Sequence, residues 1–434
     1  MKILTVKNFG PIVQAKVDLE KEYQIYIGIQ ASGKSTLCKL CYFFRKIRDY
    51  TLEFLIDSDQ FSYNHKNEYF NNYLKYLTRN FMGCFGTTKH LKPFFITYDC
   101  EKFQIHINLK KGFVKFHFDD RMKKSLIDLF EEAAIVHEKW KNPISIMKKM
   151  EILANIRSAM DQRVQSLFLD DAEIVYIPAG RSLFAIISDK LQHIPLDSLD
   201  LTMKEFIQKI TETKYLFGLR IPDMVQNYLQ TVKGQIDNDA IKDAYDLIKN
   251  ILKADYASEN DGEKIYFDSE HWVKLMYSSS GQQEALWILM LCFLYILKKR
   301  KTFMIVEEPE AHLFPMAQKD IVTLIALMTN VTKSNIIVTT HSPYILTSAN
   351  ILLLSASIEK TKKIKKKSTP TIIKKRFRLN PNSFGAYLLV DGKPSDIVDR
   401  ETNMIDIKSI DAVSEITNDE MVSLLDKEEN NYDM

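Results

Sequence analysis

The sequence lacks the features of a secreted, disulfide-bonded or membrane-spanning protein. It has only five cysteines, an odd number that does not suggest a disulfide framework. Its first residues show no basic start followed by an apolar stretch, so no secretory signal is indicated. The longest apolar run, residues 285–297, is shorter than the roughly 20 residues that span a bilayer. We therefore expect a cytoplasmic protein without a membrane segment, in which residues 285–297 form a buried helix.

The chain also has little net charge. The formal charge is only +3, so the overall balance says little about partners. Hydrophobic residues make up 46% and charged residues 26% of the 434 residues, which is typical of a globular protein with a substantial core. This length allows two or three domains, or one domain with large insertions.

The order of expected elements favours a single α/β core split by a long helical insertion. We expect a hairpin at 2–6 and 12–19, a strand at 22–28 and a helix from Gly33 to about residue 48. Helical patterns cover 121–169 and 182–252. The other expected strands are 94–98, 103–109, 113–118, 173–177, 265–267, 272–276, 303–306, 336–339 and 351–354. The strand and helix units of an α/β core therefore open the chain and return only after residue 280.

A phosphate-binding loop is predicted directly after the strand 22–28. Residues 28–35 read GIQASGKS and fit G-x-x-x-x-G-K-[ST] in full, with a strand before and a helix after. In such a loop backbone N–H groups face the phosphates, Lys34 neutralises the β- and γ-phosphates, and the Ser35 hydroxyl binds magnesium. The alternative is a chance match in a loop. The candidate nucleotide-binding residues here are Gly28, Gln30, Ala31, Ser32, Gly33, Lys34, Ser35 and Thr36.

Two adjacent acids follow the apolar strand 303–306. A strand end beside the phosphate loop is where an acid would hold the magnesium shell, and we assign this role to Glu307. We assign Glu308 to orient and deprotonate the attacking water. The alternative is a solvated glutamate cluster at the end of a strand.

Two further segments fit the same site. Ser279, Ser280, Gly281 and Gln282 precede the long apolar helix, where they form either a simple N-cap or an anion-binding helix start. His341 follows the strand 336–339, so it can reach a γ-phosphate at the same sheet edge; a histidine on its own would more often be structural.

Taken in order, these segments resemble the ABC-type ATPase heads of the OLD and RecF/SMC-like group. The stretch EEPEAHLFP at 307–315 is similar to that of OLD-like prokaryotic ATPases. The resemblance covers about half the chain (residues 1–40, 94–118, 170–185 and 253–355). It implies an α/β fold of the ABC-type head, with a mixed-sheet core and an antiparallel β subdomain, split by a long helical insertion. It implies ATP and Mg²⁺ as cofactors, Glu308, Lys34 and His341 as catalytic residues, and Ser35 and Glu307 as magnesium ligands.

The resemblance extends to pairing and to three further segments. In such ATPases two heads pair head to tail, so a homodimer or higher homo-oligomer is expected, and the signature of one head, here 279–282, caps the nucleotide of the other. Residues 310–313 would form the D-loop, and 177–181 (IPAGR) resembles an (I)PAxR segment in which Arg181 faces the nucleotide. The sequence departs from the pattern at Ser278 and Ser280, where LSGGQ has leucine and glycine, and at Glu307, where aspartate is common. No glutamine is identified for the Q-loop.

Charge is unevenly distributed toward the C-terminus. Residues 359–378 hold ten Lys or Arg and one Glu, whereas 411–434 hold eight acids and one Lys. The basic stretch is either a solvated loop or a contact for the phosphate backbone, with nucleic acid as an additional partner. We therefore divide the chain into an N-terminal ATPase lobe (1–118), a helical insertion or arm (119–252), a C-terminal ATPase lobe (253–358) and a basic loop with an acidic tail (359–434).

The expected function is an ATPase subunit that regulates a separate effector. Fewer than 100 residues follow His341, and they show no TOPRIM-type acidic array, no HNH-like histidine cluster and no metal-ligand spacing. By analogy with Septu- and PARIS-like antiphage systems, the chain would sense infection and control a separately encoded nuclease or toxin. The alternative is a RecF-like repair ATPase that acts as an ATP-gated DNA clamp. A transporter subunit fits less well, because the loop and signature are far apart, and a non-hydrolysing scaffold is the remaining reading.

Overall fold

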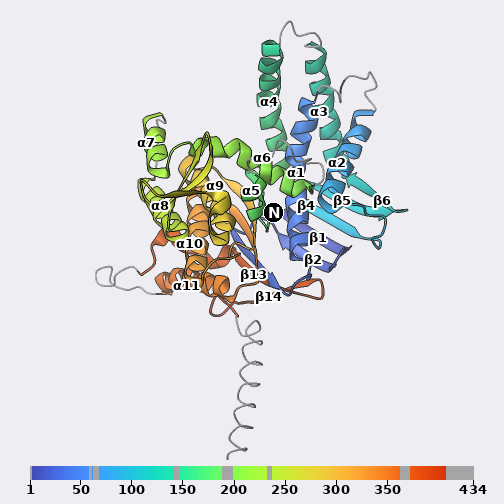
Figure 1. Cartoon of the computed structure of the whole chain (residues 1–434). Helices are drawn as coiled ribbons and strands as arrows, with labels where there is room; N and C mark the ends of the chain where they lie inside the picture. Colours follow the sequence, from blue (N-terminus) through green and yellow to red (C-terminus); the bar gives the residue numbers. More distant parts are fainter. Residues whose placement is uncertain are drawn as a thin grey trace, which may run out of the picture.

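The structure, a computed structural model, describes residues 2–57, 61, 68–139, 146–187, 199–231, 237–361 and 372–406. At its centre lies a six-stranded mixed sheet in the order β14-β13-β3-β12-β11-β7 (Figure 1). All neighbouring pairs are parallel except β13 with β14. Its strands are β3 (Tyr23–Gly28), β7 (Glu173–Ile177), β11 (Thr302–Glu307), β12 (Asn335–Thr340), β13 (Phe384–Val390) and β14 (Lys393–Asp396).

Both faces of this sheet are covered, as the apolar sequences of its strands require. Successive residues of a strand face opposite sides, and in β11 Met304 packs into one hydrophobic core while Phe303 packs into the other. The first core is closed by helices α5 to α11. These are α5 (Ser182–Ile187), α6 (Leu201–Lys214), α7 (Ile221–Thr231), α8 (Asn238–Leu252), α9 (Ser280–Lys298), α10 (Pro315–Thr332) and α11 (Pro343–Thr361).

The second core lies between the central sheet and an antiparallel five-stranded sheet, order β2-β1-β4-β5-β6. Its strands are β1 (Lys2–Phe9), β2 (Ile12–Asp18), β4 (Phe95–Cys100), β5 (Phe103–Lys110) and β6 (Phe113–Phe118). Helices α1 (Lys34–Ile56) and α2 (Tyr69–Phe85) fill the space between them. The expected α/β class, with a mixed core sheet and an antiparallel β subdomain split by helices, is confirmed.

Two helices form an arm that projects from the sheets. Helices α3 (Asp120–Lys139) and α4 (Ile146–Phe168) stand side by side at the top of Figure 1, and Glu132 pairs with Arg163 between them. The base of α4 packs along α1, the helix that follows the glycine-rich loop. The arm is therefore anchored on the element that begins at Lys34.

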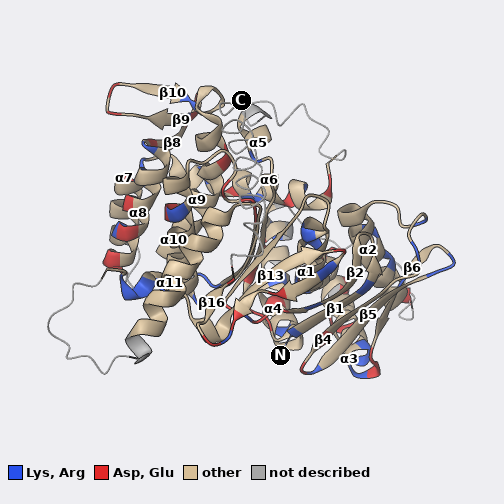
Figure 2. Cartoon of the chain, turned by 90° about the horizontal axis from the view of Figure 1, so that it is seen from below, with Lys and Arg blue, Asp and Glu red and all other residues tan. Residues whose placement is uncertain are grey.

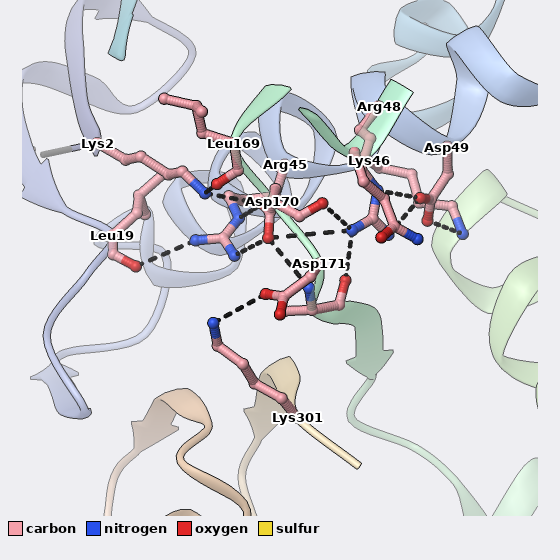
Figure 3. A network of polar contacts seen from close by, with 12 residues as sticks. Lys2, Leu19, Arg45, Lys46, Arg48, Asp49, Leu169, Asp170, Asp171 and Lys301 are labelled. Carbon is pink, nitrogen blue, oxygen red and sulfur yellow. Dashed lines mark hydrogen bonds and ion pairs between the residues drawn. The ribbon is translucent and has the colours of Figure 1, made fainter. Parts of the chain in front are cut away.

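A buried ion cluster connects the end of α4 to α1 and β1 (Figure 3). Asp170, directly after α4, lies 2.7 Å from Arg45 Nε and 3.2 Å from Lys2 Nζ. Arg48 donates to the carbonyl oxygens of Asp170 and Ala172, at 3.0 and 2.7 Å. Burial alone would raise the pKa of Asp170, but the three cations outweigh it and lower that pKa. The Asp170 cluster, defined as Asp170 with Lys2, Arg45 and Arg48, thus ties β1, α1 and the end of the arm together.

The long apolar helix is a core helix, as expected. Every residue from Gln283 to Leu297 is buried. Within the described residues, Ser280–Lys298 is the one helix long and apolar enough to cross a membrane, yet 83% of its apolar window is buried inside the fold. A core helix passes the same test, so this is weak evidence for a membrane span. The five cysteines are free and buried.

Several expectations for the elements need correction. Residues 351–354 were expected to form a strand but belong to α11. Residues 359–434 were expected to be only a loop and a tail, whereas β13 and β14 extend the core sheet beside β3. A third strand, β8 (Asp255–Glu259), joins the expected pair β9 (Gly262–Tyr266) and β10 (Trp272–Lys274). The C-terminal strands β15 (Val398–Asp399) and β16 (Met404–Ile405) form a short pair.

Candidate functional site

The candidate site is built where four parallel strands end at one edge of the core sheet. Register pairs Thr340 with Ile27, Glu307 with Thr339, and Val306 with Ile177. The ends of β3, β12, β11 and β7 therefore lie level with one another. Neighbouring strands are about 4.8 Å apart, so the segments that follow these four strands share one edge.

The glycine-rich loop leaves β3 in a conformation that few residues adopt. Gly33, which precedes α1, has φ +102°, and Ala31 has φ +62°. A side chain at Gly28 would come within 2.5 Å of the carbonyl oxygen of Leu389 on β13. The loop therefore requires glycine at both motif positions, one for its backbone angle and one for the close approach of the last core strand.

The side chains of the loop differ in burial and in hydrogen bonding. Lys34 is buried and its Nζ donates to the carbonyl oxygens of Gly28 and Ile29, at 2.8 and 3.0 Å. Ser32 is buried and its hydroxyl oxygen has no hydrogen-bond partner. The remaining candidate residues of the loop are more accessible: Gln30, Ala31 and Ser35 are exposed, and Thr36 is half-buried.

The paired acids occupy different environments. Glu307 is buried, and its Oε2 accepts a hydrogen bond from the Ala179 backbone N–H at 3.2 Å. Its Oε1 has no partner at hydrogen-bond distance, although the Glu307 carboxylate adds to burial in raising the pKa of the Tyr176 hydroxyl. Glu308 is more open, and its Oε1 lies 3.4 Å from Nε2 of His341, which is itself exposed. The structure thus brings Glu308 and His341 together, with Glu307 on the protein side of them.

A third acid, Glu310, belongs to the site although the sequence placed it only in a D-loop. Its Oε1 accepts hydrogen bonds from the Thr340 hydroxyl at 2.7 Å and the His341 backbone N–H at 2.8 Å. Its Oε2 is buried without a partner. Glu310 therefore fixes the backbone from which His341 projects. The acidic residue two positions after Glu308 was the available signal.

The charges of Lys34 and of the three acids influence one another. Burial lowers the pKa of Lys34, while the carboxylates of Glu308, Glu310 and Glu307 act in the opposite direction. Burial raises the pKa of Glu310, and the nearby charge of Glu308 raises it further. The loop lysine and the three acids consequently belong to one electrostatic group, whose members come from β3–α1 and from the end of β11.

Arg181 is buried beneath this group, and its guanidinium is bonded to backbone oxygens of the protein. It is fully buried, and its Nη1 and Nη2 donate to the carbonyl oxygens of Glu307 and Glu308, at 2.6 and 2.9 Å. Its Nε donates to the Glu284 carbonyl oxygen at 2.8 Å. The resemblance implied that Arg181 faces the nucleotide; in this structure its donors face protein oxygens. Sequence reasoning also missed Glu284, whose carboxylate accepts the backbone N–H groups of Arg181 and Ser182, both at 3.1 Å.

The serine-rich segment caps α9, as the simpler alternative proposed. Ser279 is the N-cap, and it exchanges hydrogen bonds with Gln282 in a capping box. The Gln282 amide also donates to the Leu252 carbonyl oxygen at 2.8 Å. Ser279 and Ser280 are exposed, and Gly281 packs so closely on residue His312 that an added Cβ would lie 2.8 Å from its carbonyl oxygen. Within this chain the segment therefore sits against the segment that follows the paired acids.

The residues at the edge fit a nucleotide with magnesium. Three buried oxygens, those of Ser32 Oγ, Glu307 Oε1 and Glu310 Oε2, have no partner, and such atoms are normally satisfied by protein, water or a ligand. The glycine-rich cradle adds free backbone N–H groups at the start of α1. Ser35 and Glu307 supply the oxygen ligands that magnesium prefers.

The basic segment is only partly described. Residues 362–371 and the acidic tail 411–434 lie outside the described residues, so both interpretations stay predictions there. Lys374 pairs with Asp243 at 2.6 Å, and Arg376 pairs with Asp239 at 3.1 Å and with Asp237 at 3.5 Å. These acids belong to α8 or directly precede it, and Figure 2 shows red acidic and blue basic segments beside each other at α8. Two cations at the described end of the basic segment, Lys374 and Arg376, are therefore paired with acids of the same chain.

One part of the chain is similar to a family of ATPases. Residues 194–346, about a third of the chain, match the family described as AAA ATPase domain. This match includes Glu307, Glu308 and His341 but not the loop at 28–35. It supports an ATPase of the AAA type. No curated protein matches the chain.

Solved structures include similar arrangements of elements. The SMC head domain from Thermotoga maritima is 11% identical and aligns over 92% of this chain and 98% of that chain, with a TM-score of 0.37. An Smc head domain with an extended coiled coil, bound to the C-terminal domain of ScpA derived from Pyrococcus furiosus, is 15% identical and aligns over 96% and 100%, with a TM-score of 0.36. Likeness at this level carries no functional argument.

Proposed function

We propose that this chain binds ATP with magnesium and hydrolyses it when two heads pair head to tail. One observation supports this above all. Lys34, Glu307, Glu308 and His341 come from three segments far apart in the sequence, yet they meet at one edge of the core sheet, next to unpartnered buried oxygens. In a structural charge cluster each buried charge normally meets an opposite charge.

Binding would use the loop, the helix start and the acidic strand end. The backbone N–H groups at the start of α1 and the Lys34 ammonium would hold the phosphates. In this structure the Lys34 ammonium donates to two loop carbonyl oxygens. An ammonium has three N–H donors, so the third would be available for a phosphate oxygen. Ser35 and Glu307 would hold the magnesium ion, which neutralises phosphate charge when bound.

Hydrolysis would depend on Glu308 and His341. The half-buried Glu308 carboxylate would orient the attacking water and take its proton. The His341 ring, 3.4 Å from that carboxylate, would contact both the carboxylate and the γ-phosphate and keep them correctly oriented. Glu310 keeps His341 in place through its hydrogen bonds to the backbone N–H of His341 and to Thr340.

Head-to-tail pairing would complete each site. The exposed Ser279 and Ser280 mark the N-terminal end of α9, where unpaired N–H groups and the helix dipole attract anions. Gly281 at this end packs on His312 of its own chain, in the segment that follows Glu308. The partner head would place its own helix start over the γ-phosphate held by Lys34.

The test is the variant Glu308→Gln, measured by phosphate release and by equilibrium ATP binding. We expect kcat to fall by about 10²–10⁴-fold, because a positioned general base contributes about that much. ATP affinity should be kept, and a dimer should accumulate in light scattering with ATP and magnesium. Glu101→Gln, at an exposed turn between β4 and β5, is the control and should hydrolyse ATP like the wild type. Unchanged turnover in Glu308→Gln would refute the proposal.

For the biological role, we propose that the ATPase senses infection and regulates a separately encoded nuclease or toxin in antiphage defence. This step rests on the resemblance to OLD-like ATPases and not on the site. The test is to express the chain with the product of the neighbouring reading frame and to challenge the cells with phage, with the wild type and Glu308→Gln compared. Protection that does not need the neighbour, together with turnover stimulated by duplex DNA, would instead favour the DNA-clamp alternative.

A further inference from the structure

One buried side chain donates to four carbonyl oxygens, from three backbone segments, beneath the proposed catalytic acid. The guanidinium of Arg181 contacts the carbonyl oxygens of Pro178 at 2.8 Å, Glu284 at 2.8 Å, Glu307 at 2.6 Å and Glu308 at 2.9 Å. These oxygens lie after β7, in the first turns of α9, at the end of β11 and one residue beyond it. We propose that Arg181 is a positioning residue, which sets the backbone conformation of Glu308 and couples it to the start of α9.

Most of the N–H donors of the Arg181 guanidinium are bonded to these carbonyl oxygens. A guanidinium has five N–H donors in a fixed plane. Nε and Nη1 account for three of them, through the bonds to Glu284, Pro178 and Glu307, and Nη2 donates to the Glu308 carbonyl oxygen. The remaining Nη2 donor faces the Glu284 carboxylate, whose Oε2 is 3.4 Å away. Four of the five donors are thus bonded to backbone carbonyl oxygens, so Arg181 acts on the site through other residues.

The backbone of Glu308 needs such support. Its φ is +44°, in the left-handed region that is unfavourable for a residue with a side chain. Its N–H donates to the Thr339 carbonyl oxygen at 2.9 Å, and its own carbonyl oxygen accepts from Arg181 and from the Ala311 N–H at 3.1 Å. Because the direction of the Glu308 side chain follows from these angles, Arg181 determines where the carboxylate points.

Glu284 supplies the matching negative charge. It is buried, and its two carboxylate oxygens accept the backbone N–H groups of Arg181 and Ser182. It lies only two residues after Gln282 of the capping box, so the serine-rich end of α9 and the Glu308 peptide are held by the same ion pair. A displacement of that end of α9, for example by a partner head, would therefore shift Glu308 in the same chain.

The test combines Arg181→Lys with a matched control, Arg48→Lys. Arg48 is also a buried arginine bonded to backbone carbonyl oxygens, but it lies in the Asp170 cluster. Lysine keeps the charge and has only a point-like ammonium, so it cannot reach all of the carbonyl oxygens. We expect hydrogen–deuterium exchange of peptides covering residues 304–313 and 279–290 to speed up in Arg181→Lys and to stay unchanged in Arg48→Lys.

A kinetic readout separates positioning from general destabilisation. We expect kcat for ATP hydrolysis to fall by about 10- to 100-fold in Arg181→Lys, since small misplacements of catalytic groups have effects of that size, with KM within about threefold. In Arg48→Lys both should stay near the wild type. Glu284→Gln is the second variant, should Arg181→Lys fail to fold, and it should show the same exchange pattern and the same loss of kcat.

Unchanged exchange at 304–313 in folded Arg181→Lys and Glu284→Gln would overturn the inference, as would a loss of kcat no larger than in Arg48→Lys. The kinetic part rests on the proposed hydrolysis, whereas the exchange part does not. A wild type that turns over no ATP would therefore refute the proposed function, and the exchange data would still decide the role of Arg181.

Discussion

Two charged clusters in this molecule differ in how their buried charges are balanced. In the Asp170 cluster, at the base of the arm, the carboxylate of Asp170 meets Arg45 and Lys2, and Arg48 is bonded to carbonyl oxygens. In the cluster at the sheet edge, buried oxygens of Ser32, Glu307 and Glu310 are left without partners. The edge cluster is defined as Ser32, Lys34, Glu307, Glu308, Glu310 and His341.

The difference separates a structural site from a site built for a ligand. Buried charges are tolerated when they are paired and hydrogen-bonded, and the Asp170 cluster meets that condition within the chain. Three acids near one lysine do not meet it, because repulsion among the acids and desolvation both remain. A magnesium ion and a phosphate chain would complete the edge cluster, so it should gain stability from ligands, whereas the Asp170 cluster should not.

The largest stability effect is expected when the Asp170 cluster is broken. Asp170→Asn leaves the buried Arg45 and Lys2 without their counter-charge, and losing one partner of a buried ion pair typically costs about 3–5 kcal/mol. We expect a loss of that size in the free energy of unfolding, measured with denaturant. Asp171→Asn is the control: Asp171 pairs with Lys301 in an exposed position, so its loss should cost at most about 1 kcal/mol. Equal effects of the two variants would remove the structural half of the comparison.

Ligand-dependent stability should come from the edge cluster. ATP with magnesium at 100 times its Kd should stabilise the wild type by about 2.7 kcal/mol, seen as a rise in Tm. Lys34→Ala should lose this stabilisation, because Lys34 is the cation that faces the phosphates. Arg48→Lys, in the Asp170 cluster, should keep most of it. A ligand effect that persists in Lys34→Ala would place the nucleotide elsewhere.

A smaller effect is expected on the pH dependence of the free energy of unfolding. The folded-state pKa of Asp170 is lowered, since the three cations outweigh burial, so its contribution is present above the unfolded pKa of about 3.9 and is lost as pH falls through the folded pKa. The slope is at most about 1.4 kcal/mol per pH unit for one proton. Unfolding free energies measured between pH 6 and pH 3 should therefore fall more steeply in the wild type than in Asp170→Asn. Parallel curves would contradict the assignment.

Much of the fold followed from the sequence because local patterns were strong. The hairpin β1–β2, the strand β7 and the core helix α9 lie where alternation and apolar length predicted them. Residues 351–354 were misjudged because a short apolar run fits either a strand or a helix, and only the packing of α11 decides. The strand β13 was missed because its place beside β3 depends on a partner far away in the sequence.

The candidate site followed from motifs, but its supporting contacts did not. Parallel strands end at a common edge, so Lys34, Glu307 and His341 could be placed together from order alone. No spacing rule shows that the Arg181 side chain turns beneath the strand ends, or that Glu310 holds His341. These are tertiary contacts, which depend on how the segments pack and not on local pattern.

The smallest expected effect is the most direct contrast with Asp170. Burial raises the folded-state pKa of Glu310, so its ionised form costs stability above that pKa, and the cost disappears as pH falls. Glu310→Gln keeps an oxygen for the Thr340 hydroxyl and the His341 N–H but removes the charge. At pH 8 we expect the free energy of unfolding to stay the same or to rise by less than about 1 kcal/mol, with the gain shrinking toward acid. The same exchange of carboxylate for amide would thus stabilise one cluster slightly and destabilise the other strongly. A clear loss of stability in Glu310→Gln would show that the edge cluster is satisfied without a ligand, and the two sites would then be of one kind.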